Sequence, residues 1–137
     1  MTRICLDTSA YTNFRRGSPE AVQAITRARS VLVPVIVLGE LHAGFQLGSR
    51  TEENEAGLIQ FLSNPAVRVV NVDHETADTY AELFADLRRA GTPVPTNDLW
   101  VAAMAVREGA TVLTYDDHFR RIVRVGCLVL KTTPVAV

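Results

Sequence analysis

Four carboxylates occupy positions where a folded domain does not place a bare negative charge without a partner. They are Asp7, Glu40, Asp98 and Asp116. Asp7 closes an apolar run and Asp116 lies two residues beyond a later one, while Glu40 and Asp98 belong to stretches with helical periodicity. Two carboxylates about 4 Å apart repel each other by roughly 4 kcal/mol at an effective dielectric constant of about 20. If the fold brings the four together, a cation is needed to keep them ionised.

The ligand types in this set indicate which cation that is. Carboxylate oxygens, with no cysteine or histidine expected among them, select a hard ion, and Mg²⁺ or Mn²⁺ fits best. Such an ion activates water and stabilises the charge that develops on a phosphodiester during hydrolysis. An acid that does not bind the ion directly can then serve as a general base. The carboxylates therefore predict a metal-dependent hydrolytic nuclease.

Glu40 is the hardest of the four to explain as an ordinary surface acid. Its neighbours one helical turn away are apolar or small, namely Ile36, Val37, Ala43 and Gly44. The carboxylate is therefore expected on the buried face of its helix, where an unpaired charge costs several kcal/mol. No arginine stands one turn away, so the partner is either a distant arginine or a metal ion. Asp98, by contrast, has the simpler alternative of stabilising a helix N-terminus.

The elements that must position these acids alternate along the chain. Five short apolar runs predict strands, at 3–6, 30–33, 67–72, 111–114 and 127–130. Their nearly continuous apolar character is typical of parallel strands covered on both faces. Helical patterns lie between them, at 19–29, 35–47, 52–62, between Asp73 and Gly91, and at 99–108 with Thr96 or Asn97 as its cap. The chain is thus an α/β domain, and Asp7 and Asp116 both follow strands at the edge where α/β proteins bind ligands.

Two further details of the helices are expected from their spacing. In the long fourth helix, an apolar stripe is predicted to face the core; it consists of Ala77, Tyr80, Ala81, Phe84 and Leu87. Trp100, in an almost wholly apolar helix, is assigned to the core, and the histidines are expected at the surface or behind the ligands.

Composition is consistent with one soluble, cytoplasmic domain spanning 1–137. The chain has 137 residues, of which 47% are hydrophobic, and a formal net charge of -1. It has no apolar run of membrane-spanning length and no signal-peptide pattern at its start. Cys5 and Cys127 lie in separate apolar runs and are expected to be buried thiols. The charge excludes a protein that coats nucleic acid through bulk positive charge, so any contact with RNA must be local.

Arginines supply almost all of the positive charge. Arginine binds phosphate through two hydrogen bonds and stacks on bases, so clustered arginines are candidates for holding RNA. These are Arg15, Arg16, Arg120, Arg121 and Arg124. A biased genome would give the same overall arginine count, but the last three follow Asp116 closely, which favours a role near the acids.

Four motifs, taken in order, resemble the PIN domain, and in particular the toxin ribonucleases of the VapC type. They are Leu6-Asp7-Thr8-Ser9, Glu40 within Val-Leu-Gly-Glu-Leu, Thr96-Asn97-Asp98, and Thr114-Tyr115-Asp116-Asp117-His118-Phe119. The resemblance covers essentially the whole chain. It implies a three-layer α/β/α fold with a central, mostly parallel five-stranded sheet. It also implies Mg²⁺- or Mn²⁺-dependent endoribonuclease activity, inhibition by a VapB-type antitoxin, and a homodimer.

Carried over residue by residue, the resemblance assigns Asp7, Glu40, Asp98 and Asp116 to the acidic quartet of the family. Ser9 and Thr114 match hydroxyl positions near the metal. Two roles are open to Asp117: it shares metal binding with its neighbour, or it is a solvated acid that caps the short turn 117–121. An amphipathic antitoxin helix is expected to dock on Ala43-Gly44 and on the face formed by Val22, Ile25 and Ala28.

Other readings of the same acids are weaker. A haloacid-dehalogenase-like phosphatase needs a second acid two positions after Asp7, where Ser9 stands. A receiver domain needs an acidic pair near the first strand, and Asp7 has no adjacent acid. The remaining alternative is a non-catalytic RNA-binding module of the same fold, in which the acids hold a structural cation.

Overall fold

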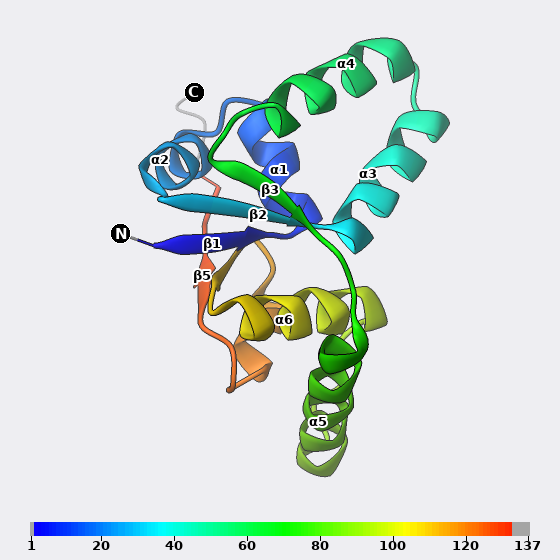
Figure 1. The fold of residues 1–137 in the computed structure, drawn as a ribbon, viewed down its shortest axis with the longest axis vertical. Coiled ribbons are helices and arrows are strands. Elements are labelled where there is room, and N and C mark those ends of the chain that lie inside the picture. The colour runs from blue at the N-terminus through cyan, green and yellow to red at the C-terminus, as the bar shows by residue number, and fades with distance from the viewer. Residues whose placement is uncertain (1, 133–137) are drawn as a thin grey trace.

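A five-stranded sheet, parallel throughout, organises residues 2–132, which the computed structural model describes (Figure 1). The strands lie in the order β3-β2-β1-β4-β5. Their bounds are Arg3–Leu6 for β1, Ser30–Pro34 for β2, Val67–Val70 for β3, Thr111–Thr114 for β4 and Cys127–Val129 for β5. All five predicted strands are present, with β3 and β5 slightly shorter than expected, and the expected mostly parallel sheet contains only parallel pairs.

Six helices flank this sheet. They are α1 (Thr8–Arg15), α2 (Pro19–Arg27), α3 (Val35–Leu47), α4 (Thr51–Leu62), α5 (His74–Ala90) and α6 (Thr96–Glu108), and a 3₁₀ turn, η1, covers Asp117–Arg121. In Figure 1, α1 and α4 lie above the strands and α5 and α6 below them, while α3 and α4 form a hairpin that projects from one end. The architecture agrees with the predicted α/β/α layers.

The order in which strands are added to the sheet reverses between β1 and β4. After β1 it builds β2 and β3 on one side, and it later adds β4 and β5 on the other. Leu6 and Leu113 are partners in the β1–β4 register, and the backbone N–H of Asp7 donates to the carbonyl of Leu113. The central strands are buried because helices cover both faces. Asp7 and the residues after β4 therefore emerge together at the point where the strand order reverses.

One helix and one helix cap differ from the expectation based on the sequence. Helix α1 was not predicted, because its eight residues bury only Ala10 and Tyr11 and show no long apolar stripe. Its signal was the N-cap: Asp7 accepts a hydrogen bond from the backbone N–H of Ala10. Helix α6 begins at Thr96, after Pro95, so neither Thr96 nor Asn97 caps it as predicted.

The predicted core stripe of α5 is partly wrong. Leu87 is buried and Tyr80 half-buried, but Ala77, Ala81 and Phe84 are exposed, Phe84 to 46%. The buried residues of α5 are Thr76, Leu83 and Leu87. The helix packs on α6 and not on the sheet, and the ring of Tyr80 stacks on that of Trp100 with centroids 4.0 Å apart. Trp100 is accordingly half-buried, at the border of the core it was assigned to.

The two cysteines are free thiols. Cys5 is buried in β1, and desolvation raises its pKa to about 12, so it is an inert core residue as predicted. Cys127 is half-buried at the sheet edge. Within residues 2–132, every helix is too short or too polar to cross a membrane.

Candidate metal centre

All four predicted acids line one open cleft beyond the carboxyl ends of the strands. The cleft has a volume of about 390 Å³. Its walls are formed by Asp7, Thr8, Ser9, Thr12, Asn13, Arg16, Glu40, Asp98 and Asp116. The acids come from four different segments: the end of β1, the middle of α3, the first turn of α6 and the end of β4. The fold thus brings together side chains up to 109 positions apart in the sequence, counted from Asp7 to Asp116.

Asp7 lies deepest, with 6% of its surface exposed. Its carboxylate accepts hydrogen bonds from the hydroxyls of Ser9 (2.7 Å) and Thr114 (2.5 Å) and from the backbone N–H of Ala10 (2.9 Å). Burial raises the pKa of Asp7 above its usual range, and these three hydrogen bonds act in the opposite direction. The carboxylate is therefore held in one orientation by donors from both α1 and β4.

The two hydroxyl residues placed near the metal by the family resemblance also connect the strand ends. Thr114, fully buried, accepts a hydrogen bond from the backbone N–H of Asp116 at 2.9 Å while donating to Asp7. Ser9 accepts one from the backbone N–H of Tyr115 at 3.0 Å. These bonds fix the segment after β4 against the start of α1, so the positions of Asp7 and Asp116 are set by the same pair of hydroxyls.

Glu40 reaches the cleft from α3, but it is half-buried and not on a buried face as expected. Ala43 and Gly44, one turn further on, are exposed, because α3 leaves the sheet and projects with α4. The partner of Glu40 within the protein is Thr8, whose hydroxyl donates to Oε1 at 2.8 Å. Sequence reasoning had not assigned Thr8 a role, although it stands beside Asp7 in the N-terminal motif.

Asp98 carries the largest electrostatic perturbation among the four acids. It stands at the third position of α6, with 21% of its side chain exposed. Burial raises its pKa to about 6, and the charges of Asp116, Asp7 and Glu40 add to the rise. Its neighbourhood is therefore strongly negative when the cleft holds no cation, although Asp98 is near a helix N-terminus that favours an anion.

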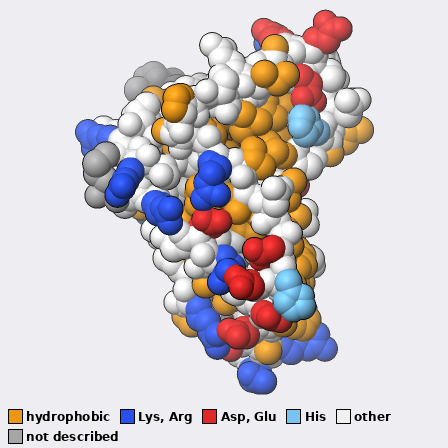
Figure 2. Space-filling view, viewed as in Figure 1, with side chains coloured by type: hydrophobic (Ala, Val, Ile, Leu, Met, Phe, Trp, Pro, Cys, Tyr) orange, Lys and Arg blue, Asp and Glu red, His pale blue; other side chains and the backbone are white. Residues whose placement is uncertain are grey.

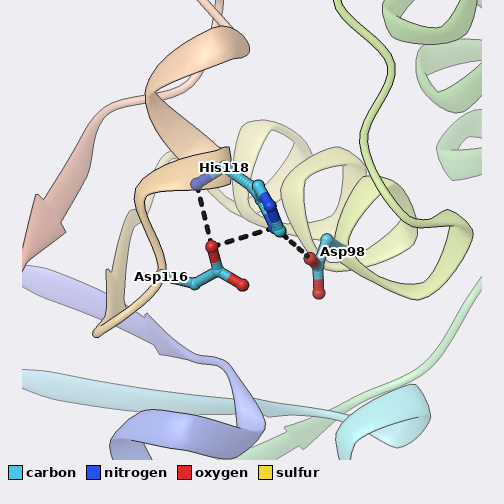
Figure 3. A group of neighbouring side chains, drawn as sticks. All are labelled: Asp98, Asp116 and His118. Atoms are coloured by element: carbon cyan, nitrogen blue, oxygen red, sulfur yellow. Dashed lines mark hydrogen bonds and ion pairs between the residues drawn. The ribbon is translucent and has the colours of Figure 1, made fainter.

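A histidine, His118, lies beside Asp116 and Asp98, as Figure 3 shows. Asp116 caps η1 by accepting the backbone N–H of His118 at 2.9 Å. The Nδ1 atom of His118 lies 2.9 Å from Oδ1 of Asp116 and 3.8 Å from Oδ2 of Asp98. Across residues 2–132, these three are the only group whose ligand atoms all lie within 4.8 Å of one another and could hold a metal ion. The sequence analysis expected no histidine among the ligands, but η1 places His118 next to Asp116.

Most of the arginines predicted to bind RNA already have partners inside the protein. Arg16 lines the cleft. Arg120 pairs with Asp117, Arg121 donates to the carbonyl of Pro93, and Arg124 bridges to Glu82 and Asp86 of α5. The Arg15 guanidinium lies against α4, where a β-carbon at Gly57 would come within 2.5 Å of it. Asp117 is exposed, opens η1 and is not among the residues that line the cleft, and the cap of the turn is Asp116.

Two observations fit a divalent cation to this arrangement. Burial, and then the charges of Asp116, Asp7 and Glu40, raise the pKa of Asp98, and a bound cation would offset both effects. The Nδ1 atom of His118 is shielded from solvent and has no hydrogen-bond partner among the described residues, although two carboxylates lie beside it. Oxygen-rich groups of this kind hold Mg²⁺ or Mn²⁺ while leaving part of the coordination sphere to water.

Comparison with known proteins supports the fold and indicates the family. A family model described as PIN domain matches residues 4–125. Ribonuclease VapC5 of Mycobacterium tuberculosis is 32% identical over 114 residues, which cover 83% of each protein. Among solved structures, DNA-bound VapBC from Salmonella typhimurium superposes with a TM-score of 0.82 at 25% identity, over 93% of this chain and 98% of the other. VapBC-5 from M. tuberculosis superposes with a TM-score of 0.75 at 26% identity, over 95% of this chain and 100% of the other.

Proposed function

The chain belongs to the PIN domain family, with VapC ribonuclease toxins among its relatives, and from this premise we propose that it is itself a toxin ribonuclease. It cleaves RNA phosphodiester bonds with the help of Mg²⁺ or Mn²⁺, and a VapB-type antitoxin holds it inactive. The observation that carries the proposal is the convergence of Asp7, Glu40, Asp98 and Asp116 on one cleft.

The four acids would take three different tasks. Asp98 and Asp116, which each offer a carboxylate oxygen within 4.8 Å of the other, would hold the ion, which when bound supplies an activated water and charge stabilisation on the phosphate. Three hydrogen-bond donors fix the carboxylate of Asp7 between the ends of β1 and β4. In this position Asp7 can add a ligand oxygen to the ion. Glu40 lies on α3, where the hydroxyl of Thr8 donates a hydrogen bond to it. From there it can accept a proton from the attacking water.

RNA must enter this acidic cleft despite its own negative charge. Arg16 is the arginine that lines the cleft, so it is the best placed to bind a phosphate next to the cleaved bond. Arg15, Arg120, Arg121 and Arg124 remain predicted RNA contacts. Each of the last three would keep or exchange its present partner when RNA binds, and Arg124, tied to α5 by two acids, is the least available.

Apolar surface outside the cleft supports the antitoxin as a partner. One groove, of about 440 Å³, includes Phe14, Ile25, Ala28 and Phe61 in its walls. Ile25 and Ala28 belong to the face predicted for docking, and Val22 is half-buried outside the groove. Apolar side chains also gather in the upper part of Figure 2, where α3 and α4 project. An amphipathic segment with acidic and apolar residues would cover such a surface.

A matched pair of variants tests the enzyme. Asp116→Asn keeps the shape of the side chain but removes one ligand charge, and Asp78→Asn removes an exposed charge on α5. Incubated with total bacterial RNA and resolved on a gel, wild type and Asp78→Asn should cleave in Mn²⁺ or Mg²⁺ and stop in excess EDTA. Asp116→Asn should be slower by orders of magnitude, since about 1.4 kcal/mol of lost transition-state stabilisation is tenfold in rate.

The same variants test the toxin. Wild-type protein produced in bacteria without antitoxin should arrest growth, and Asp116→Asn should not. If all three proteins leave the RNA unchanged and the wild type still binds RNA, the chain is a non-catalytic RNA-binding module of this fold. If wild-type protein accumulates, folded, in healthy cells, the toxin assignment is wrong.

A further inference from the structure

We propose that His118 is a direct ligand of the metal, so that the ion is held by two carboxylates and one imidazole nitrogen. This inference rests on the proposed metal-dependent function and adds to it the identity of a third ligand. It has a consequence for which metal the protein prefers. A nitrogen ligand shifts preference away from Mg²⁺ and toward Mn²⁺ and later first-row ions, whose affinities for mixed nitrogen and oxygen sites rise in a fixed order.

The distances around Nδ1 of His118 match those between ligands of one ion. In an octahedral site with bonds of about 2.1 Å, adjacent ligands lie about 3 Å apart and opposite ligands about 4 Å apart. Nδ1 is 2.9 Å from Oδ1 of Asp116 and 3.8 Å from Oδ2 of Asp98. Both separations fall within this range, so one ion can contact all three atoms after small side-chain adjustments.

The short contact between His118 and Asp116 is not explained by a hydrogen bond. Although Nδ1 and Oδ1 are 2.9 Å apart, the oxygen lies away from the direction in which a ring N–H would point, and Nδ1 has no partner among the described residues. The atom is also shielded from water. A buried nitrogen without a hydrogen bond is costly, and a cation that it can bind removes this cost.

The backbone holds the ring in this place. The N–H of His118 donates to the same carboxylate that its ring approaches, which closes the first turn of η1. The next residue, Phe119, is fully buried in the core and prevents the turn from rotating outward. His118 is thus presented to Asp116 and Asp98 by a rigid segment, as a metal ligand must be.

Charge also favours a neutral third ligand. Two carboxylates already balance the charge of a divalent ion, and each further acid adds repulsion to a cleft that contains Asp7 and Glu40. A neutral imidazole adds a bond to the ion without adding negative charge. His118 therefore strengthens metal binding where another carboxylate would weaken its neighbours.

The experiment uses Mn²⁺ bound to the full-length protein. Pulsed electron paramagnetic resonance detects a nitrogen nucleus bonded directly to Mn²⁺, and calorimetry measures the affinities for Mg²⁺, Mn²⁺ and Co²⁺. The variants are His118→Gln and, as a matched control, His42→Gln. His42 pairs with Glu55 between α3 and α4, outside the cleft-lining set.

Wild type and His42→Gln should both show one imidazole nitrogen coupled to Mn²⁺, and His118→Gln should show none. His118→Gln should also lose about tenfold in affinity for Mn²⁺ and Co²⁺, equivalent to about 1.4 kcal/mol, and less for Mg²⁺. Absence of nitrogen coupling in the wild type overturns the inference even if His118→Gln fails to fold.

A further variant separates this inference from the proposed function. If Asp116→Asn abolishes Mn²⁺ binding while wild-type protein shows no nitrogen coupling, the metal site stands and the histidine ligand does not. If Asp116→Asn binds Mn²⁺ as tightly as the wild type, the metal site of the proposed function is wrong, and the histidine ligand falls with it.

Discussion

Removing the charge of Asp98 should stabilise the protein when no metal is present. The pKa of this carboxyl is raised from an ordinary 3.8 to about 6, chiefly by burial and then by the charges of Asp116, Asp7 and Glu40. At pH 7 the ionised group therefore destabilises the fold by about 3 kcal/mol, since tenfold in proton affinity is about 1.4 kcal/mol. Asn at this position has the same shape and no charge.

Part of the stability that Asp98→Asn would add is lost because Asp98 stands in the first turn of α6. A negative charge at a helix N-terminus contributes about 0.3–1 kcal/mol, which Asp98→Asn would forfeit. The net expectation is about 2 kcal/mol of added stability at pH 7. Because the folded protein holds the Asp98 proton more tightly than the unfolded chain, wild-type stability should fall as pH rises from about 4 to about 6. The stability of Asp98→Asn should fall less over the same pH range. Some of the fall should remain in the variant, because the pKa of Asp7 is also raised.

Urea unfolding in EDTA between pH 4 and pH 8 measures both quantities, with Asp78→Asn as a control for loss of an exposed charge. A variant that is less stable than wild type at pH 7 would refute the reasoning, because Asp98 would then be a structural partner. The reasoning would also be refuted if the free energy of unfolding changed with pH by the same amount in wild type and in Asp98→Asn. Addition of Mn²⁺ at a hundredfold excess over its dissociation constant should stabilise wild type by about 2.7 kcal/mol, and the variant by less.

Four further changes have outcomes set by the structure. Thr114→Val removes a buried hydroxyl that donates to Asp7, and it should cost about 1–3 kcal/mol in urea unfolding; an unchanged midpoint would contradict the hydrogen-bond network. Gly39→Ala, in open space within α3, should stabilise by about 0.5–1 kcal/mol. Gly57→Ala should gain less, because its β-carbon meets the Arg15 guanidinium, and equal gains would show that the guanidinium moves freely. Phe84→Glu should disrupt a homodimer in sedimentation experiments if the exposed face of α5 forms the interface, and an unchanged dimer would place it elsewhere.

The sequence predicted the sheet, and it placed Asp7 and Asp116 at one edge of that sheet, because both follow from local rules. Buried parallel strands read as continuous apolar runs, and ligands collect where such strands end, so Asp7 and Asp116 could be placed at one edge before the fold was known. Asp98 and Glu40 followed from charges in otherwise apolar helices. The structure adds that all four line a single cleft.

What the sequence did not predict depends on contacts between elements distant in the chain. The exposed side of α5 could not be read from its periodicity, because two faces of that helix carry apolar residues and packing on α6 selects between them. The approach of His118 to Asp98 requires η1 and the start of α6 to meet, which no spacing encodes. The hydroxyl of Thr8 reaches Glu40 only because α1 and α3 lie side by side.

The strand order also determines when during synthesis the cleft can exist. Asp7 and Glu40 belong to the first half of the chain, with β1, β2 and β3, whereas Asp98 and Asp116 arrive with α6 and β4. Until β4 has been made, one edge of the central strand β1 has no neighbour, and Thr114 is not yet there to fix Asp7. A chain emerging N-terminus first therefore assembles its acids only after α6 and β4 have been made. If the chain cuts RNA as proposed, its nascent form would lack the complete set of acids until that point.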